Sequence, residues 1–444
     1  MDRIEKRIAY IIDENSSKIT AFAEDIFTHP ELGFKETRTS GKVEEIFKSL
    51  SLEVQNNLAI TGVKARLKKQ NEKEINIAVI GELDAVKSPG HPFADPATGA
   101  AHCCGHHAQL GVLYGAALAL SDPEIAHQLG GNVTFFAVPA EEYGEIEFKD
   151  SLRKGGRLRY LGGKAELIAE GAFDDVDIAL GYHSAFGESP YDAMIGGGSS
   201  NGFISKLVRF KGRESHAAGS PHTGINALNA AVLGLSALNF QRETFREEDT
   251  IRVHPIMTKG GDLVNVIPGE AVIELLVRAR NIPAILDANA KATRAFEAGA
   301  HAIGAKLEIT DLPGYLPLLP EYPDSPFLDA AKKLLHEEKI QEVKPNLSAT
   351  FSTDYGDLSY VKPVFTFNTP GLSGEAHAEN VRVENPYKAY ILPAKIMALA
   401  VYGLLKNGAA AAKEIKKSHR PPFSREDFTA FLDSIIWKGE KSNV

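Results

Sequence analysis

The sequence contains few cysteines and no extended apolar segment. Its 444 residues include only 2 cysteines, Cys103 and Cys104, which are adjacent and cannot form an ordinary structural disulfide with each other. Because no other cysteine is available, a reducing compartment is the simplest interpretation, and we expect a cytoplasmic protein. We find no run of about 18 apolar residues, which predicts that nothing spans a membrane. The charged, amphipathic N-terminus is not typical of a signal peptide.

An excess of positive charge is also absent. The chain has 49 Lys and Arg residues against 58 Asp and Glu residues, a formal net charge of -9. This balance argues against a nucleic-acid partner, because phosphate binding needs a concentrated basic surface. The hydrophobic content of 43% and the charged content of 24% are ordinary for a globular enzyme. A chain of this length is expected to form two domains.

Strand-like and helical patterns alternate in the first part of the chain. Apolar spacing predicts a helix within the first 29 residues and a second helix over residues 37–50. Apolar runs predict strands at 61–67, 75–80, 131–139 and 177–182, and the last three are followed by polar residues. This order predicts an α/β sheet with a functional site along the carboxyl edge of its strands.

The pattern changes at the glycine-rich segment 196–200. Strands at 203–210, 250–257, 271–279 and 305–311 and helices at 224–238 and 283–302 follow in the order β-α-β-β-α-β, which is typical of a ferredoxin-like α+β domain. We therefore predict a discontinuous catalytic domain, residues 1–196 and 314–444, with a mixed sheet flanked by helices. Residues 197–313 form the inserted domain. The chain after residue 313 is expected to be mostly helical.

Cys104 and His106 lie on either side of Gly105, in a segment with three histidines in six positions. A packed core rarely tolerates such a cluster, and thiolate and imidazole are strong ligands for zinc and similar ions. The pattern favours metal binding by Cys104 and His106. For Cys103 and His102, packing or a supporting role is at least as well favoured, and the role of His107 stays open.

Carboxylates and two further histidines provide the other candidates. Glu141 and Glu142 follow an apolar strand, where one carboxylate can bind a metal and its neighbour can take a proton from water. An isolated pair would more often be a solvated acidic turn. His183 also follows a strand and is a ligand candidate, whereas His377, in the polar loop 371–380, has no distinguishing context of its own.

Taken in chain order, these segments resemble the amidohydrolase branch of the M20 metallopeptidase family. That branch includes the indole-acetyl-amino-acid, hippurate and aminobenzoyl-glutamate hydrolases. The matching segments are 29–34, 81–84, 102–106, 139–142, 181–183, 215–218, 221–227, 260–268, 277–278, 352–354 and His377. The stretch 352–359 looks closest to the aminobenzoyl-glutamate hydrolase-like group.

The resemblance implies an α/β, phosphorylase/hydrolase-like catalytic domain with an inserted lid and dimerisation domain. It also implies two divalent ions per subunit, Mn²⁺ or Zn²⁺, with Co²⁺ and Ni²⁺ as further candidates. The implied ligands are Cys104, His106, Glu142, His183 and His377, with the Cys104 thiolate shared between the ions.

The resemblance further implies roles around the ions. Glu141 would be the general base and then the general acid, and Asp84 would orient a ligand. His216 would polarise the scissile carbonyl or hold the oxyanion, and in dimeric relatives this histidine comes from the partner subunit. Asn265 and Arg278 would hold a substrate carboxylate, a role suited to the bidentate guanidinium.

The chain departs from the branch at four positions. The usual Cys-Gly-His-Asp-x-His continues after His106 as His107, Ala108 and Gln109, and the usual Asp-Met-Asp becomes Glu82, Leu83 and Asp84. None of these changes removes an implied ligand. We expect them to alter metal preference or the shape of the leaving-group pocket.

These observations predict a binuclear metal amidohydrolase that cleaves an N-acyl or N-aroyl amino acid or a similar carboxylate-bearing amide. A dipeptidase or carboxypeptidase using the same site is the first alternative, and a catalytically silent binding protein is the second. We expect a small-molecule substrate, a homodimer through the inserted domain, and neither a nucleic-acid nor a membrane partner.

Overall fold

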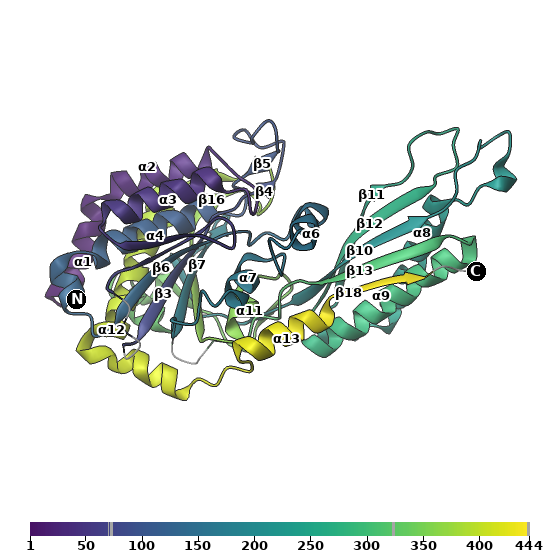
Figure 1. The fold of residues 1–444 in the computed structure, drawn as a ribbon. Helices are drawn as coiled ribbons and strands as arrows, with labels where there is room; N and C mark the ends of the chain where they lie inside the picture. The colour runs from purple at the N-terminus through teal and green to yellow at the C-terminus, as the bar shows by residue number, and fades with distance from the viewer. Residues whose placement is uncertain (70, 72–73, 322–324, 442–444) are drawn as a thin grey trace.

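The computed structural model describes residues 1–69, 71, 74–321 and 325–441, which form two domains (Figure 1). The larger domain is built on one mixed sheet with the strand order β1-β2-β6-β3-β7-β16-β8-β14, and β17 pairs with β16. Its strands are β1 (Glu53–Leu58), β2 (Gly62–Arg66), β3 (Asn76–Glu82), β6 (Asn132–Val138), β7 (Ile178–Phe186), β8 (Ala193–Ile195), β14 (Ile340–Glu342), β16 (Val364–Ser373) and β17 (Arg382–Val383). The four central strands, β6, β3, β7 and β16, are parallel.

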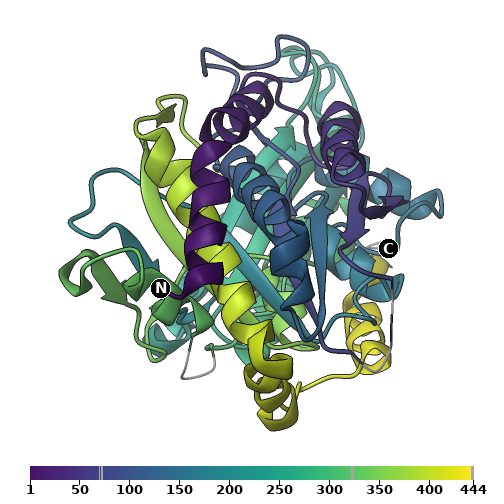
Figure 2. The same cartoon turned by 90° about the vertical axis from the view of Figure 1, so that its left-hand side faces the viewer.

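Helices cover both faces of this sheet because its central strands are apolar on both sides. In β3, Ile77 and Val79 pack in one core cluster, and the intervening Ala78 and Ile80 pack in another. This pattern is typical of a parallel sheet between two helical layers. The first layer contains α1 (Arg3–Glu14), α2 (Ser16–Phe27), α4 (His106–Leu120) and α12 (Leu392–Ser418), and α4 and α12 lie side by side (Figure 2). The second layer contains α7 (Gly163–Ala169), α11 (Tyr355–Ser359) and α13 (Arg425–Ile435).

Two predictions for the larger domain were inaccurate. The first 29 residues form two helices, α1 and α2, which are separated at Asn15. The expectation of a mostly helical end is wrong at the centre of the sheet, where β16 pairs with β7. Pro370 and Gly371 interrupt the apolar run of β16, so the sequence shows only a short strand pattern there.

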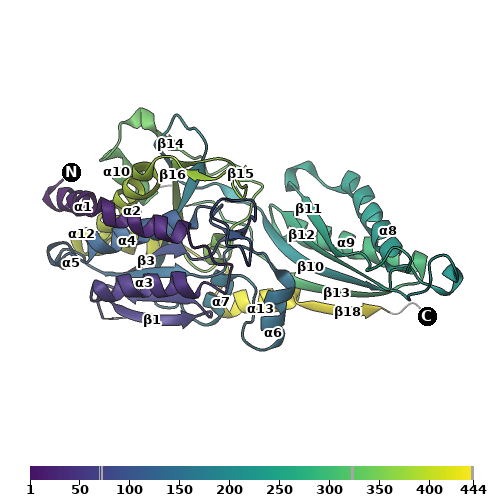
Figure 3. The ribbon, with the colours of Figure 1, turned by 90° about the horizontal axis from the view of Figure 1, so that it is seen from above.

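The inserted domain has the predicted order of elements. Its antiparallel sheet has the strand order β11-β12-β10-β13-β18. The predicted elements are β10 (Gly202–Lys211), α8 (Ala227–Phe240), β11 (Arg252–Lys259), β12 (Glu270–Ala279), α9 (Ile282–Ile303) and β13 (Lys306–Pro313). Helices α8 and α9 cover the same face of the sheet (Figure 3), and the small residues Gly234 and Gly299 allow their close approach.

The C-terminal part of the chain returns to the inserted domain. Strand β18 (Trp437–Lys441) pairs antiparallel with β13. The structure therefore differs from the predicted division, in which residues 314–444 belong to the catalytic domain alone. Helix α13 leads into β18 and packs at the junction of the two domains, where Leu432 and Ile435 line a small depression with Phe203.

Four further helices and two pairs of short strands complete the described α-helices and strands. The helices are α3 (Thr37–Ser49), α5 (Pro123–His127), α6 (Ile146–Lys154) and α10 (Pro326–Lys332), and the paired strands are β4 (Val86–Lys87) with β5 (Ala100–Ala101) and β9 (Ser199–Ser200) with β15 (Ser348–Ala349).

One helical segment of the described chain, Tyr387–Ser418, is long and apolar enough to cross a membrane, although none was expected. Its apolar window is 89% buried inside the protein. A core helix of a large domain has this property, and this segment lies at the centre of the first helical layer.

Candidate active site

The residues of the candidate site come from the carboxyl edge of the central strands. Cys104 and His106 lie on either side of Gly105, which has a φ of 92° and precedes α4. A Cβ at Gly105 would lie 3.1 Å from Leu372 Cδ1 and 3.3 Å from Ser184 Cβ. The left-handed backbone and the close neighbours explain why glycine separates the two side chains.

Two groups of donor atoms share the sulphur of Cys104. The first group is Cys104, His106 and His183, and the second is Cys104, Glu142 and His377; within each group the donor atoms lie within 4.8 Å of one another. Cys104 Sγ lies 3.5 Å from His183 Nε2, and His377 Nε2 lies 3.1 Å from Glu142 Oε1. The structure thus brings together all five residues that the resemblance implied as ligands.

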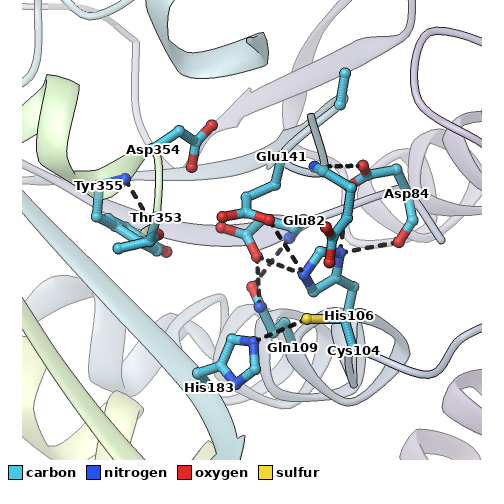
Figure 4. A network of polar contacts seen from close by, with 12 residues as sticks. Glu82, Asp84, Cys104, His106, Gln109, Glu141, His183, Thr353, Asp354 and Tyr355 are labelled. Carbon is cyan, nitrogen blue, oxygen red and sulfur yellow. Dashed lines mark hydrogen bonds and ion pairs between the residues drawn. The ribbon is translucent and has the colours of Figure 1, made fainter. Parts of the chain in front are cut away.

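His106 is oriented by Asp84 (Figure 4). Its Nδ1 lies 2.9 Å from the backbone oxygen of Asp84 and 3.2 Å from Asp84 Oδ1. The opposite nitrogen, Nε2, therefore faces Cys104 and the carboxylates. The second oxygen of Asp84 accepts a hydrogen bond of 2.8 Å from the backbone nitrogen of Glu142. Asp84 therefore contacts the ring of one candidate ligand and the backbone of a second, a placement that would allow it to position both.

Glu82 is part of the site, and sequence reasoning gave it no role beyond a departure from the family pattern. Its Oε2 lies 3.1 Å from His106 Nε2, and Glu141 Oε2 lies 3.8 Å from the same nitrogen. Glu82, His106 and Glu141 form a third buried group of possible donors. The signal in the sequence was the position of Glu82 at the carboxyl end of a buried strand, the same signal that identified Glu141.

Buried partners hold the Glu82 carboxylate from two sides (Figure 4). Gln109 Nε2 donates to Glu82 Oε2 at 2.6 Å, and the backbone nitrogen of Glu82 donates to Gln109 Oε1 at 3.1 Å. Lys164 Nζ lies 2.6 Å from Glu82 Oε1 and 2.5 Å from Asp354 Oδ1. A fully buried lysine is stabilised by such pairing, because an unpaired charge at this depth would be strongly unfavourable.

Burial and charge together set the pKa values of the site. Burial, reinforced by the charges of Glu82 and Glu142, raises the pKa of Glu141 well above its ordinary value. Burial, reinforced by the charge of Glu142, likewise raises the pKa of the Cys104 thiol. Burial acts against protonation of His106, but the neighbouring Cys104 and Glu82 raise its pKa well above the ordinary value. The hydrogen bond to Glu142 raises the pKa of His377.

The donor set suits divalent ions. His106 Nε2 and Glu142 Oε1 are buried, and each faces another candidate donor at 3.1 Å, Glu82 Oε2 and His377 Nε2 respectively, so both can serve as ligand atoms. One thiolate, three imidazoles and one carboxylate form the mixed sulphur, nitrogen and oxygen set that Zn²⁺ and similar ions prefer. The concentration of buried carboxylates around them is also compatible with several positive charges at the centre.

The residues implied for substrate binding lie in two places. Arg278, on β12, lies close to the site, where its Nη1 donates to Ser352 Oγ at 3.4 Å and its buried Nε has no hydrogen-bond partner among the described residues. His216 and Asn265 instead lie at the far end of the inserted domain, where the backbone nitrogen of Ala217 donates to the oxygen of Asn265 at 2.9 Å. Strand β10 has 10 residues and spans about 30 Å, so neither side chain reaches the metal ligands of its own chain.

The departures at His107 and Gln109 lie beneath the site. His107 is buried and packs against Phe27 at a ring-centroid distance of 4.6 Å and against Tyr390 at 5.9 Å. Gln109 is buried against Glu82. In this chain, an amide paired with a longer carboxylate occupies the two positions at which the branch usually has histidine and aspartate.

The chain is similar to curated proteins and to solved structures. An Xaa-Arg dipeptidase of Mus musculus is 28% identical over 376 residues, covering 82% of this chain and 79% of the relative. An N-acyl-L-amino acid amidohydrolase of Geobacillus stearothermophilus is 25% identical over 332 residues, covering 71% of this chain and 81% of the relative. The solved structure of the Bacillus subtilis YXEP protein, titled a dinuclear metal binding peptidase from the M20 family, has a TM-score of 0.62 and 22% identity and covers 88% of this chain and 99% of that one.

The family model matches residues 78–402, which contain Glu82 and every proposed ligand from Cys104 to His377. Members of this family with named activities are hydrolases of amides and peptides, and the coarse chemistry of the site agrees with them. The fold, the match over most of the chain and the named relatives together establish that the chain belongs to peptidase family M20/M25/M40 and is a metal-dependent hydrolase.

Proposed function

We propose that the protein is a binuclear metal-dependent amidohydrolase that cleaves the amide bond of an N-acyl or N-aroyl amino acid. The observation that carries this proposal is the pair of donor groups that share Cys104, with the Glu141 carboxylate beside them. The five donors would hold two divalent ions, with Mn²⁺ and Zn²⁺ as first candidates. This arrangement also argues against a silent binding protein, because no ligand position has been lost.

Glu141 has the properties of a general base. When two metal ions are bound, they supply an acidified water and stabilise negative charge on the substrate oxygen. Glu141 accepts the proton of the attacking water and then donates it to the leaving amine nitrogen. Its raised pKa in a buried site suits a group that must both take and release a proton near neutral pH.

Arg278 is proposed to hold the free carboxylate of the substrate. Its guanidinium lies over the Phe203 ring at 5.4 Å and has a buried, unpartnered Nε, so two of its donors can meet a carboxylate once substrate enters. Binding at this point would connect the substrate to the inserted domain, and binding energy would then contribute to closing the site.

His216 and Asn265 are proposed to act in the active site of a second copy of the chain. Both are exposed at the tip of the inserted domain, next to Leu263 and Val264, whose exposed fractions are 64% and 104%. Further exposed apolar side chains lie on α8 and β11, namely Val232, Leu233, Phe240, Ile256 and Met257. These residues support a homodimer in which each tip completes the partner's site.

A dipeptidase is the second candidate function. The similarity to an Xaa-Arg dipeptidase over 82% of this chain favours it. The two functions differ in the group next to the scissile carbonyl. A dipeptidase needs to recognise a free α-amine there, whereas an acyl-amino-acid hydrolase accommodates an apolar acyl or aroyl group.

A substrate panel with metal analysis tests the proposal. The panel varies the acyl group (acetyl, benzoyl and 4-aminobenzoyl) and the amino acid separately, and it includes dipeptides with the same C-terminal residues. We expect two equivalents of metal per chain, chelator-sensitive turnover of the acylated compounds and little turnover of the dipeptides. Exclusive turnover of the dipeptides would establish the alternative, and the absence of both metal and turnover would contradict both functions. We also propose a cytoplasmic location, in agreement with the two free buried cysteines.

A further inference from the structure

Two of the three chain crossings between the domains pass one aromatic cluster, and the third is the passage from α13 into β18. The chain enters the inserted domain at Phe203 and leaves it at Tyr315, and the backbone nitrogen of Phe203 donates to the oxygen of Tyr315 at 2.8 Å. The ring of Tyr143, from the catalytic domain, packs edge-on against both of these rings, with centroids 5.0 Å from Phe203 and 5.6 Å from Tyr315. We call Phe203 and residues 312–316 the hinge, and residues 140–143 the catalytic segment. Because Tyr143 directly follows Glu142, the hinge lies against the catalytic segment.

Two hydrogen bonds cross between the hinge and this segment in opposite directions. The Tyr143 hydroxyl donates to the backbone oxygen of Pro313 at 2.7 Å, and the Tyr315 hydroxyl donates to the backbone oxygen of Glu141. Both hydroxyls are buried, and burial raises the pKa of each tyrosine well above its ordinary value, so both remain protonated donors. The hinge and the catalytic segment therefore hold each other through one pair of reciprocal contacts.

The backbone of the catalytic segment depends on such outside contacts. Ala140 has a φ of 51°, a left-handed conformation that is unfavourable for a residue with a side chain and persists only where surrounding contacts hold it. Its backbone nitrogen donates to Glu36 Oε1 at 2.8 Å, and Lys149 Nζ donates to the oxygen of Glu142 at 2.6 Å. Both of these hydrogen bonds come from residues of the catalytic domain. The hydrogen bond from the Tyr315 hydroxyl to the Glu141 oxygen comes from the hinge.

We propose that Tyr143 and Tyr315 form a reciprocal clasp through which the hinge of the inserted domain positions Glu141. The two tyrosines are positioning residues, because neither hydroxyl reaches the donor groups. A rotation of the inserted domain would move Pro313 and Tyr315, and the clasp would pass that movement to the backbone of Glu141. The catalytic role of Glu141 in this inference rests on the proposed function.

The space around the clasp is compatible with this role. A Cβ at Gly314 would lie 2.2 Å from the Phe203 ring, and a Cβ at Gly162 would lie 2.8 Å from Tyr315 Cε1. Both positions adjoin the clasp and leave no room for a larger side chain. The ring of Tyr315 is thus fixed between the hinge and the start of α7, so a shift of the hinge cannot be absorbed by rotation of the ring.

A double-mutant cycle tests the clasp. Tyr143→Phe and Tyr315→Phe each remove one hydroxyl and keep the ring. We expect kcat to fall about tenfold in each variant, with less than about a twofold change in KM and unchanged metal content. Because either substitution opens the same clasp, we expect the double variant to lose about tenfold as well. Tyr160→Phe is the matched control, since its hydroxyl donates to α13, to the oxygen of Thr429 at 3.0 Å and to Asp433 Oδ1 at 2.9 Å, and to neither half of the clasp.

Amide hydrogen exchange gives a second readout that does not depend on the reaction. We expect each single substitution to accelerate exchange in both segments, 140–143 and 312–316, whereas Tyr160→Phe leaves both unchanged. A hundredfold loss of kcat in the double variant, or faster exchange confined to the segment of the substituted tyrosine, would overturn the clasp. If no amide substrate is turned over, the proposed function fails, and the exchange data alone still decide whether the hinge and the segment are coupled.

Discussion

The metal centre and the tip of the inserted domain hold their polar residues in opposite ways. At the centre, Asp84 and His106 are fully buried, and partners from distant parts of the chain fix their orientation. At the tip, His216 and Asn265 are exposed beside apolar side chains. All the candidate metal ligands of the first region come from one chain. The second region is exposed, so a second copy of the chain could bind there.

This difference has consequences for how each region responds to substitution. A buried charged group is costly to leave without its partners, so changes at the centre are expected to have large effects on metal binding or turnover. Exposed residues contribute little to the free energy of unfolding, so changes at the tip are expected to act on activity alone.

The largest effect is expected for Glu141→Gln. The amide keeps the size of the side chain but cannot accept the proton of the attacking water, so kcat should fall by about a thousandfold with unchanged metal content. Steady-state kinetics and metal analysis provide the measurement, with Glu124→Gln, a surface position of the same domain, as the control. Full turnover by Glu141→Gln would show that the base lies elsewhere.

Substitution of Cys104 should affect metal binding itself. Burial raises the pKa of this thiol above its ordinary value, so we expect it to release a proton when it becomes a thiolate ligand. Apparent metal affinity should therefore rise with pH. Calorimetry in buffers of different ionisation enthalpy should count about one fewer proton released in Cys104→Ser, with metal affinity lowered at least about a hundredfold.

The adjacent thiol provides the control for that experiment. Cys103 is also buried, but it lies outside the donor groups of the described residues. Cys103→Ser should therefore keep both metals and release the same number of protons as the wild type. An equal loss of metal in both variants would contradict the assignment of Cys104 as the shared ligand.

Subunit mixing tests whether the tip acts in trans. His216→Ala and Glu141→Gln should each be inactive alone. In a mixed dimer, the site with an intact Glu141 would receive His216 from its partner. Random 1:1 mixing should then restore about a quarter of wild-type activity, because half the dimers are mixed and each has one complete site. His222→Ala, in the same exposed loop, should remain active, and a mixture that stays inactive would contradict action in trans.

The smallest effect is expected for Gln109→Met. Methionine keeps the volume but removes both hydrogen bonds between Gln109 and Glu82, while Lys164 still pairs with that carboxylate. We expect metal affinity to fall about tenfold, the lower end of the effect of partners that support a metal ligand. Gln55→Met, on an exposed position of β1, is the control, and unchanged affinity in Gln109→Met would show that Lys164 alone holds Glu82.

Much of the site could be predicted from the sequence because its residues follow apolar strands. Glu141 and Glu142 follow the buried strand β6 after two intervening residues, and the parallel arrangement places them beside residues that follow β3. His377 had no such context, since it lies in a loop with a φ of 67° and is fixed by its backbone hydrogen bond to the oxygen of Cys103. Only the resemblance to the family identified it.

The parts that could not be predicted depend on pairing between distant segments. Lys164 has the sequence context of an ordinary helix start, and its burial between Glu82 and Asp354 results from three separate elements. The clasp likewise joins two tyrosines that lie far apart in the sequence, Tyr143 and Tyr315. Strand β18 carries too short an apolar pattern to indicate its pairing with β13.

Strand β18 also determines the order in which the molecule can be completed. A ribosome releases the five residues of this strand, Trp437–Lys441, after all the other described elements have been synthesised. The four other strands of the inserted domain can pair during translation, but the edge of β13 stays open until Trp437–Lys441 has been synthesised. Strand β18 therefore extends a sheet whose first strand, β10, was made more than two hundred residues earlier, and this connection between the two domains forms only after the sheet's other strands are in place.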